Sequence, residues 1–304
     1  MALTRVVRRL GALGGGSRSR SRAEHEDDCG RCLTLAVPHL SSEYFGELAD
    51  AVVREAGEHG WEVLVRQTGG ERDAELDVLA HAGHGPSRGL ILQPLGLGPE
   101  DAHVLAVAHP LVVLGERIFE GPVDHVTMPN AEAAETATRH LVSAGRRRIA
   151  AVGPNASDTS VTAAVLRADG YRAALSGAGI PYDPALVTDV RDWTPADGAG
   201  AVERLLRAGT PFDAVFAFAD SLAHGVLSAL ARHGLRVPQD VAVVGFDDVR
   251  SARYTIPALT TVDAGTRAVA HSAVSLLDQR IRDGHDGVPR RFTTSHRLVQ
   301  RESA

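Results

Sequence analysis

VVGFDD, residues 243–248, is an apolar stretch that ends on two adjacent carboxylates. Two valines, a glycine and a phenylalanine precede Asp247 and Asp248. The apolar part is typical of a strand that is buried on both faces, as the strands of parallel sheets are. Open parallel sheets bind ligands beyond the carboxyl ends of their strands. We therefore expect Asp247 and Asp248 either to cap a neighbouring element or to face a ligand cleft.

On both sides of this stretch, strand-like and helix-like segments alternate along the chain. In the first half, apolar runs at 33–38 and 61–67 flank a segment with helical spacing at 43–60. In the second half, runs at 213–219 and 241–246 flank another such segment at 221–234. Strands that alternate with helices of this length imply right-handed βαβ units and parallel sheets. The pattern predicts an α/β protein with two doubly wound parallel-sheet lobes.

The composition is that of an ordinary globular protein. The chain has 304 residues, about twice a typical domain, with 44% hydrophobic and 23% charged residues. A formal net charge of -6 argues against a surface that coats nucleic acid. No apolar run is long enough to span a membrane, and no secretory signal precedes the first strand, so we expect a cytoplasmic protein.

Motifs for catalysis, cofactors and metals are missing from the sequence. No GxGxxG follows the first strand, and no phosphate loop, GxSxG elbow or HExxH pair occurs. The pair Cys29 and Cys32 has no second pair to complete a structural zinc site. The sequence therefore indicates no enzyme, no cofactor and no metal.

Residues suited to binding a sugar or another polyol follow several of the expected strands. Carboxylates accept hydrogen bonds from neighbouring hydroxyls, and aromatic rings cover the apolar face of a sugar. The candidates are Tyr44, Phe45, Trp193, Phe216 and Asp247. Alternatives stay open, because Phe45 also suits a core and Trp193 a surface cover. We expect Asp220 to cap the helix that follows it.

Four segments resemble the LacI/GalR-type bacterial transcriptional regulators. These are VPHLSSEYFGELADAVVREAGEHGWEVLV (37–65), HLVSAGRRRIAAVG (140–153), LRADGYRAALSGAGI (166–180) and VPQDVAVVGFDDVRSARYTIPALTTV (237–262). They occur in the order that the family has. The resemblance implies the fold of periplasmic sugar-binding proteins, with the effector in a cleft between the lobes. It also implies an N-terminal lobe of residues 33–155 plus 264–285 and a C-terminal lobe of residues 156–263 plus 286–304.

The resemblance further implies the residues of the effector site. Asp247 would accept protons from sugar hydroxyls, Arg167 would donate to sugar oxygens, and Trp193 would stack on a sugar face. The implied site residues are Tyr44, Phe45, Asn130, Arg167, Trp193, Phe216 and Asp247. Ala219 stands where many members have asparagine, which leaves the identity of the ligand open.

The functional expectation is the effector-binding and dimerisation module of a regulator, in which ligand changes the angle between lobes within a homodimer. The alternative is a solute-binding protein of a sugar transporter, although the sequence shows no export signal. Residues 1–32 are basic and rich in Gly, Ser and Arg, without a recognisable helix-turn-helix. We expect them to be a headpiece or hinge remnant, or else a disordered tail, so that DNA is contacted only through a headpiece not evident in this chain.

Overall fold

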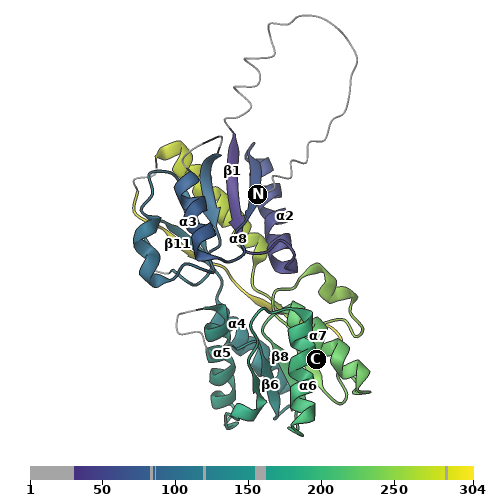
Figure 1. The fold of residues 1–304 in the computed structure, drawn as a ribbon. Helices are drawn as coiled ribbons and strands as arrows, with labels where there is room; N and C mark the ends of the chain where they lie inside the picture. The colour runs from purple at the N-terminus through teal and green to yellow at the C-terminus, as the bar shows by residue number, and fades with distance from the viewer. Residues whose placement is uncertain (1–30, 83–84, 86, 119–120, 155–161, 285–286) are drawn as a thin grey trace, which may run out of the picture.

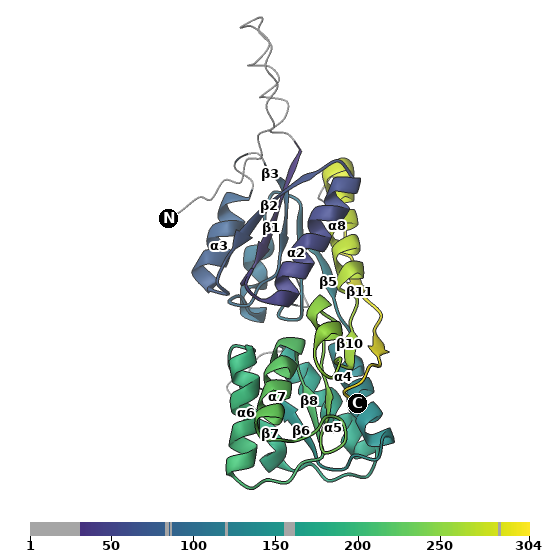
Figure 2. The ribbon, with the colours of Figure 1, turned by 90° about the vertical axis from the view of Figure 1, so that its right-hand side faces the viewer.

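The computed structural model describes residues 31–82, 85, 87–118, 121–154, 162–284 and 287–304. The predicted segment 1–32 therefore lies almost wholly outside the described residues. The described chain forms two lobes, stacked one above the other, and each contains a parallel sheet with helices against it (Figure 1 and Figure 2). This confirms the predicted fold class.

The first lobe contains a six-stranded sheet in the order β11-β5-β4-β3-β1-β2, and every neighbouring pair is parallel. Its strands are β1 (Cys32–Val37), β2 (Glu62–Gln67), β3 (Ser87–Leu92), β4 (Leu111–Leu114), β5 (Asp124–Thr127) and β11 (Arg291–Thr293). Its helical elements are α2 (Glu43–Glu58), α3 (Arg72–His81), η2 (Pro99–Leu105) and α8 (Thr266–Asp283). Helix α2 turns Leu48, Val52 and Ala56 into the core because these residues recur at helical spacing.

The second lobe contains a parallel sheet in the order β7-β6-β8-β9 and a small antiparallel sheet of β10 and β12. Its strands are β6 (Ile149–Val152), β7 (Val187–Thr188), β8 (Ala214–Ala217), β9 (Ala242–Val244), β10 (Thr261–Asp263) and β12 (Arg297–Val299). Its helical elements are α4 (Asn130–Ser143), α5 (Ala163–Gly177), η3 (Pro184–Leu186), α6 (Pro195–Arg207), α7 (Asp220–Arg232) and η4 (Arg250–Tyr254).

Two lobe boundaries differ from the predicted ones. Strand β6 was expected in the first lobe, but it pairs with β8 in the second sheet, with Ile149 opposite Ala214. Strand β11 was expected in the second lobe, but it pairs with β5 of the first, with Phe292 opposite Val126. The chain therefore crosses between lobes after β5, after β10 and after β11. A strand of three or four residues fits either sheet equally well, so its sequence does not say which sheet it joins.

Helices α4 and α5 of the second lobe pack closely because a glycine lies at their contact. A Cβ atom at Gly170 of α5 would overlap the carbonyl oxygen of Ala131 of α4. The contact brings the start of α4 beside the first half of α5, where two of the expected site residues lie. Within the described residues, no helix combines the length and the apolar character needed to cross a membrane.

Candidate functional site

Arg167, on helix α5, is the centre of a buried polar cluster in the second lobe. Its Nε donates a 2.8 Å hydrogen bond to Oδ1 of Asn130, the first residue of α4. Its Nη1 donates to the carbonyl oxygen of Phe218, just beyond strand β8. Its Nη2 lies 3.7 Å from Oδ1 of Asp247, beyond strand β9. The guanidinium is therefore held from three sides by groups at the ends of neighbouring elements.

Two aromatic rings complete the surroundings of this guanidinium. Its central carbon lies 3.5 Å from the centroid of the Phe246 ring and 5.2 Å from that of Trp193. A cation at this distance from an aromatic face is attracted by the ring quadrupole. Burial lowers the pKa of Arg167, while the charges of Asp247 and Glu116 raise it. An arginine in a protein keeps its proton, so the cluster contains one fixed positive charge.

Asn130 links this cluster to the first lobe. Its Nδ2 donates a 2.5 Å hydrogen bond to Oε1 of Glu116, which follows strand β4. Burial raises the pKa of Glu116, against the lowering effect of Arg167 and of the bond from Asn130. The cluster thus holds two acids, Glu116 and Asp247, around one arginine. Glu116 was missed in the sequence, where its position directly after the run PLVVLG is the available signal.

Asp247 lies in a turn with unusual backbone geometry. Its φ is 116° and that of Asp248 is 53°, in the region that favours glycine. The turn is fixed by a 2.8 Å bond from the amide of Asp247 to the carbonyl of Val262. Burial raises the pKa of Asp247 to about 7, although Arg167 lowers it. Strained backbone of this kind gathers at binding sites, where the surrounding structure holds it in place.

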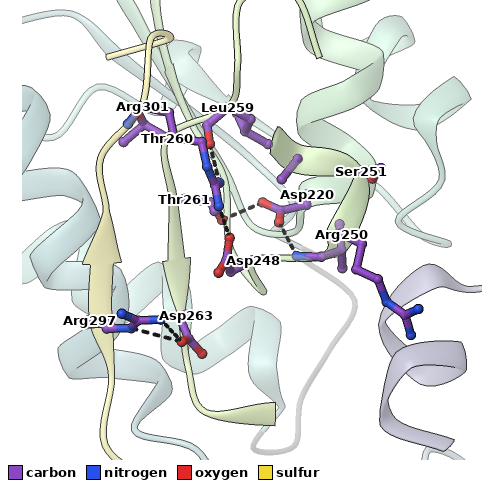
Figure 3. Close-up of polar contacts among 12 residues, drawn as sticks. Asp220, Asp248, Arg250, Ser251, Leu259, Thr260, Thr261, Asp263, Arg297 and Arg301 are labelled. Carbon is purple, nitrogen blue, oxygen red and sulfur yellow. Dashed lines mark hydrogen bonds and ion pairs between the residues drawn. The ribbon is translucent and has the colours of Figure 1, made fainter. Parts of the chain in front are cut away.

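Asp220 holds this turn through its carboxylate and does not cap its helix. Its carboxylate accepts a 3.0 Å bond from the amide of Val249 and a 2.6 Å bond from Oγ1 of Thr261 (Figure 3). Helix α7 has no side-chain cap, so the expectation of a capping Asp220 is wrong. Burial raises the pKa of Asp220 well above its usual value, and the charge of Asp247 raises it further.

Tyr44 and Phe45 begin helix α2 of the first lobe, and both are half-buried. Burial raises the pKa of Tyr44, and the charges of Asp247 and Glu116 raise it further, which places its hydroxyl in the field of both acids. The Phe45 ring meets the Tyr44 ring edge to face, with centroids 5.1 Å apart, and packs against the core. Tyr44 thus belongs to the cluster, while Phe45 supports it.

Trp193 lies beside the cluster in a fixed position. Its φ is 51°, and its Nε1 donates a 2.9 Å bond to the carbonyl of Gly153. Its own carbonyl accepts a 2.6 Å bond from Oγ of Ser221. The half-buried indole meets the Phe218 ring edge to face at 6.4 Å. The tryptophan is therefore neither a pure core residue nor a loose surface cover.

Phe216 is the expected site residue that the structure places elsewhere. It lies within β8, fully buried, with its ring centroid 5.0 Å from that of Phe218. The carbonyl that holds Arg167 belongs to Phe218, at the end of the strand. The sequence FAF offers two phenylalanines on the same face, and the strand end decides which one reaches the cluster.

The arrangement suits a neutral hydroxylated ligand. Two acids supply hydrogen-bond acceptors and offset the charge of the one arginine, which already donates two hydrogen bonds within the protein. The half-buried Trp193 supplies an aromatic face, which packs on the C–H surface of a sugar ring, whereas the fully buried Phe246 ring lies under the guanidinium of Arg167. Among the described residues, no group of three or more His, Cys, Asp and Glu side chains could hold a metal ion.

Comparison with known proteins gives consistent matches. The family described as "Periplasmic binding protein-like domain" matches residues 138–304. The HTH-type transcriptional regulator AscG of Escherichia coli is 30% identical over 263 residues, which are 86% of this chain and 76% of AscG. A solved structure described as a LacI-family transcriptional regulator from Sanguibacter keddieii is 46% identical, with a TM-score of 0.83 over 90% of this chain and 98% of that one. A complex of the transcriptional regulator CelR with cellobiose is 27% identical, with a TM-score of 0.78 over 95% and 93% of the two chains.

Proposed function

Because the chain belongs to the LacI family of transcriptional regulators, we propose that it binds a neutral sugar or related polyol as its effector. The observation that carries the proposal is the buried contact of Arg167 with Asn130 and Asp247, at the carboxyl ends of the second sheet. Tyr44 and Glu116 add groups from the first lobe, so a ligand held here would bridge the lobes. The similarity to a regulator solved with cellobiose supports a sugar.

A thermal-shift screen tests this proposal. The panel contains neutral mono- and disaccharides, cellobiose among them, their phosphorylated forms, and purines. A ligand at 100 times its dissociation constant adds about 2.7 kcal/mol to the free energy of unfolding, which is a readable shift. We expect a neutral sugar to stabilise the protein and its phosphorylated form to fail. Stabilisation by purines or anions alone would contradict the proposal.

We further propose that the protein acts as a homodimer. Tyr254 and Ile256, separated by one residue, lie on the surface of the second lobe with 80% and 96% of their areas exposed. Strand β2 is an edge strand of the first sheet and exposes Leu64. Exposed apolar side chains and open sheet edges are features of protein–protein contacts. Sedimentation equilibrium should give a dimer, and Ile256→Asp should shift it towards the monomer.

In this proposal, effector binding changes the angle between the lobes and thereby the spacing of two DNA-binding headpieces in the dimer. The alternative, a solute-binding protein of a sugar transporter, shares the fold but works as a monomer. A protein that binds sugar and stays monomeric at all accessible protein concentrations would favour this alternative. A dimer whose shape changes with sugar would favour the regulator.

A further inference from the structure

Polar contacts join the two lobes outside the effector cluster. Glu43, Glu47 and Asp50 lie on helix α2 of the first lobe, at spacings that place them along one side of the helix. Arg250 and Ser251 begin the short helix η4 of the second lobe. Figure 3 shows the Arg250 side chain extended towards α2, while Ser251 lies at the start of η4. These five residues form what we call the lobe latch.

The strongest contacts of the lobe latch go to backbone. Oε1 of Glu47 accepts a 2.6 Å bond from the amide of Arg250. Glu43 accepts a 3.2 Å bond from the amide of Ser251 on Oε1 and a 2.8 Å bond from its hydroxyl on Oε2. These bonds satisfy amides at the start of a helix, which have no partner within the helix itself. Hydrogen bonds to a carboxylate are stronger than bonds between neutral groups.

The Arg250 side chain contributes less than its contacts suggest. Its Nη2 donates a 2.7 Å bond to Oδ2 of Asp50, but the two side chains are 65% and 48% exposed. Exposed ion pairs are screened by water and lose side-chain entropy when they form. The lobe latch therefore depends on Glu43 and Glu47, whose partners are two backbone amides and the Ser251 hydroxyl; truncation of a side chain in η4 can remove only the hydroxyl bond.

The lobe latch and the effector cluster share two short segments. Tyr44 of the cluster follows Glu43 of the latch, and Asp247 of the cluster precedes Arg250 by three residues. Residues 248 and 249, between Asp247 and Arg250, are held by two hydrogen bonds. The amide of Val249 donates to Asp220, and Asp248 accepts a 2.5 Å bond from Nη2 of Arg301 (Figure 3). Asp247 is thus connected to the latch by short, fixed backbone.

We propose that Glu43 and Glu47 hold the lobes closed and thereby raise effector affinity, although neither residue belongs to the effector cluster. The effect on affinity rests on the proposed function, whereas the closure of the lobes does not. Without the two carboxylates, the amides of Arg250 and Ser251 turn to water and the lobes separate more easily. Binding then has to overcome that separation, which lowers the apparent affinity.

Small-angle X-ray scattering of the ligand-free protein tests the latch directly. We expect the double variant Glu43→Ala/Glu47→Ala to have a larger radius of gyration than the wild type at the same oligomeric state. Glu203→Ala is the matched control, because Glu203 pairs with Arg232 wholly within the second lobe. Arg250→Ala keeps the backbone bonds and should scatter like the wild type. Superimposable profiles for the double variant and the wild type, both folded by circular dichroism, would overturn the proposal.

Calorimetry with cellobiose and glucose separates the two proposals. If the wild type binds either sugar, the double variant should bind it about tenfold more weakly, within the range of typical coupling between sites. Unchanged affinity with an expanded radius of gyration would overturn the link from closure to affinity. If neither sugar binds to the wild type, the sugar assignment fails for these probes, and the scattering result still decides the latch.

Discussion

The guanidinium carbon of Arg167 lies 3.5 Å above the Phe246 ring, and Asp247 follows that ring in the chain. The same short stretch therefore supplies the aromatic face under the cation and the carboxylate beside it. Both reach the cluster because the backbone turns through positive φ at Asp247. A binding group that is already fixed loses little entropy when a ligand arrives. The strained turn thus fixes the ring and the carboxylate in place within the candidate site.

Removing the arginine should destabilise the protein in a pH-dependent way. Arg167→Met leaves the half-buried Glu116 and the buried Asp247 carboxylate without a cation, and breaking a buried charge pair in this manner costs about 3–5 kcal/mol. Urea denaturation at pH 7.5 should show this loss. At pH 5.5 the loss should be smaller, because the two acids can then take up protons and become neutral.

Arg172→Met is the matched control, since Arg172 is exposed on the same helix and pairs only with nearby groups such as Asp169. Surface substitutions of this kind change stability by about 0.5 kcal/mol or less. Equal losses for Arg167→Met at the two pH values would show that packing, and not charge, explains the effect.

Asp247→Asn should change both the pH dependence of stability and effector affinity. Burial raises the pKa of Asp247 to about 7, so the folded state binds more protons than the unfolded state between about pH 4 and 7. This contribution to stability is present at low pH and is lost as the pH rises through 7. The amide variant should therefore gain stability over the wild type at pH 8 and lose that advantage towards pH 5.

The same variant should bind its effector more weakly, by about 1.5–3 kcal/mol for one charge-assisted bond. Asp240→Asn is the control for pH, because Arg236 holds the pKa of the half-buried Asp240 below its usual value. A wild-type stability curve that is flat between pH 5 and 8, together with unchanged affinity, would remove Asp247 from the site.

Gly170→Ala should disturb the candidate site by forcing helices α4 and α5 apart at their contact. A methyl group there overlaps the carbonyl of Ala131, so the helices must separate and stretch the 2.8 Å bond from Arg167 to Asn130. Overpacking of this kind costs about 1–3 kcal/mol. Chemical denaturation and effector titration should both detect it.

Gly177→Ala is the control on the same helix, because nothing lies within 4 Å of an added Cβ at that position. Alanine is the better helix former, by up to about 1 kcal/mol in a helix interior, so this variant should be as stable as the wild type or more so. If Gly170→Ala were equally harmless, the close helix contact would not position the site.

Much of the fold was predictable, because βαβ alternation is a local signal. The order of strands and helices along the chain follows from apolar runs and helical spacing. Which lobe β6 joins, and which lobe β11 joins, was not predictable in this way. Tertiary packing decides that β6 pairs with β8 and β11 with β5. Parallel partners come from distant parts of the chain and leave no local mark.

The candidate site was predictable only where a motif carried it. Asp247, Arg167 and Asn130, which the resemblance named, lie together, and their role in effector binding stays a prediction. Glu116 was missed because a single acid after a strand is common in any α/β protein. Asp220 was taken for a helix cap because aspartate often is one, whereas its real partners, Val249 and Thr261, are 29 and 41 residues away.

Trp193 offers a direct optical test of the site. The chain has two tryptophans, and Trp61 lies in the first lobe, where its Nε1 donates a 2.8 Å bond to Asp278. In Trp61→Phe, all tryptophan emission therefore comes from Trp193. A sugar that stacks on this indole removes water from its exposed face, so we expect titration of the stabilising sugar to shift the emission to shorter wavelength, with a midpoint that equals the calorimetric dissociation constant.

The companion variant Trp193→Phe keeps an aromatic face but loses the bond to the carbonyl of Gly153. The free energy of unfolding of this variant should be about 1 kcal/mol below that of the wild type. The variant should retain part of the sugar affinity, because the phenylalanine ring still covers the C–H surface of the sugar. Trp193→Ala should lose that affinity as well. Sugar binding that leaves the emission of Trp61→Phe unchanged, and that survives Trp193→Ala at full strength, would show that the indole only packs against Phe218 and takes no part in binding.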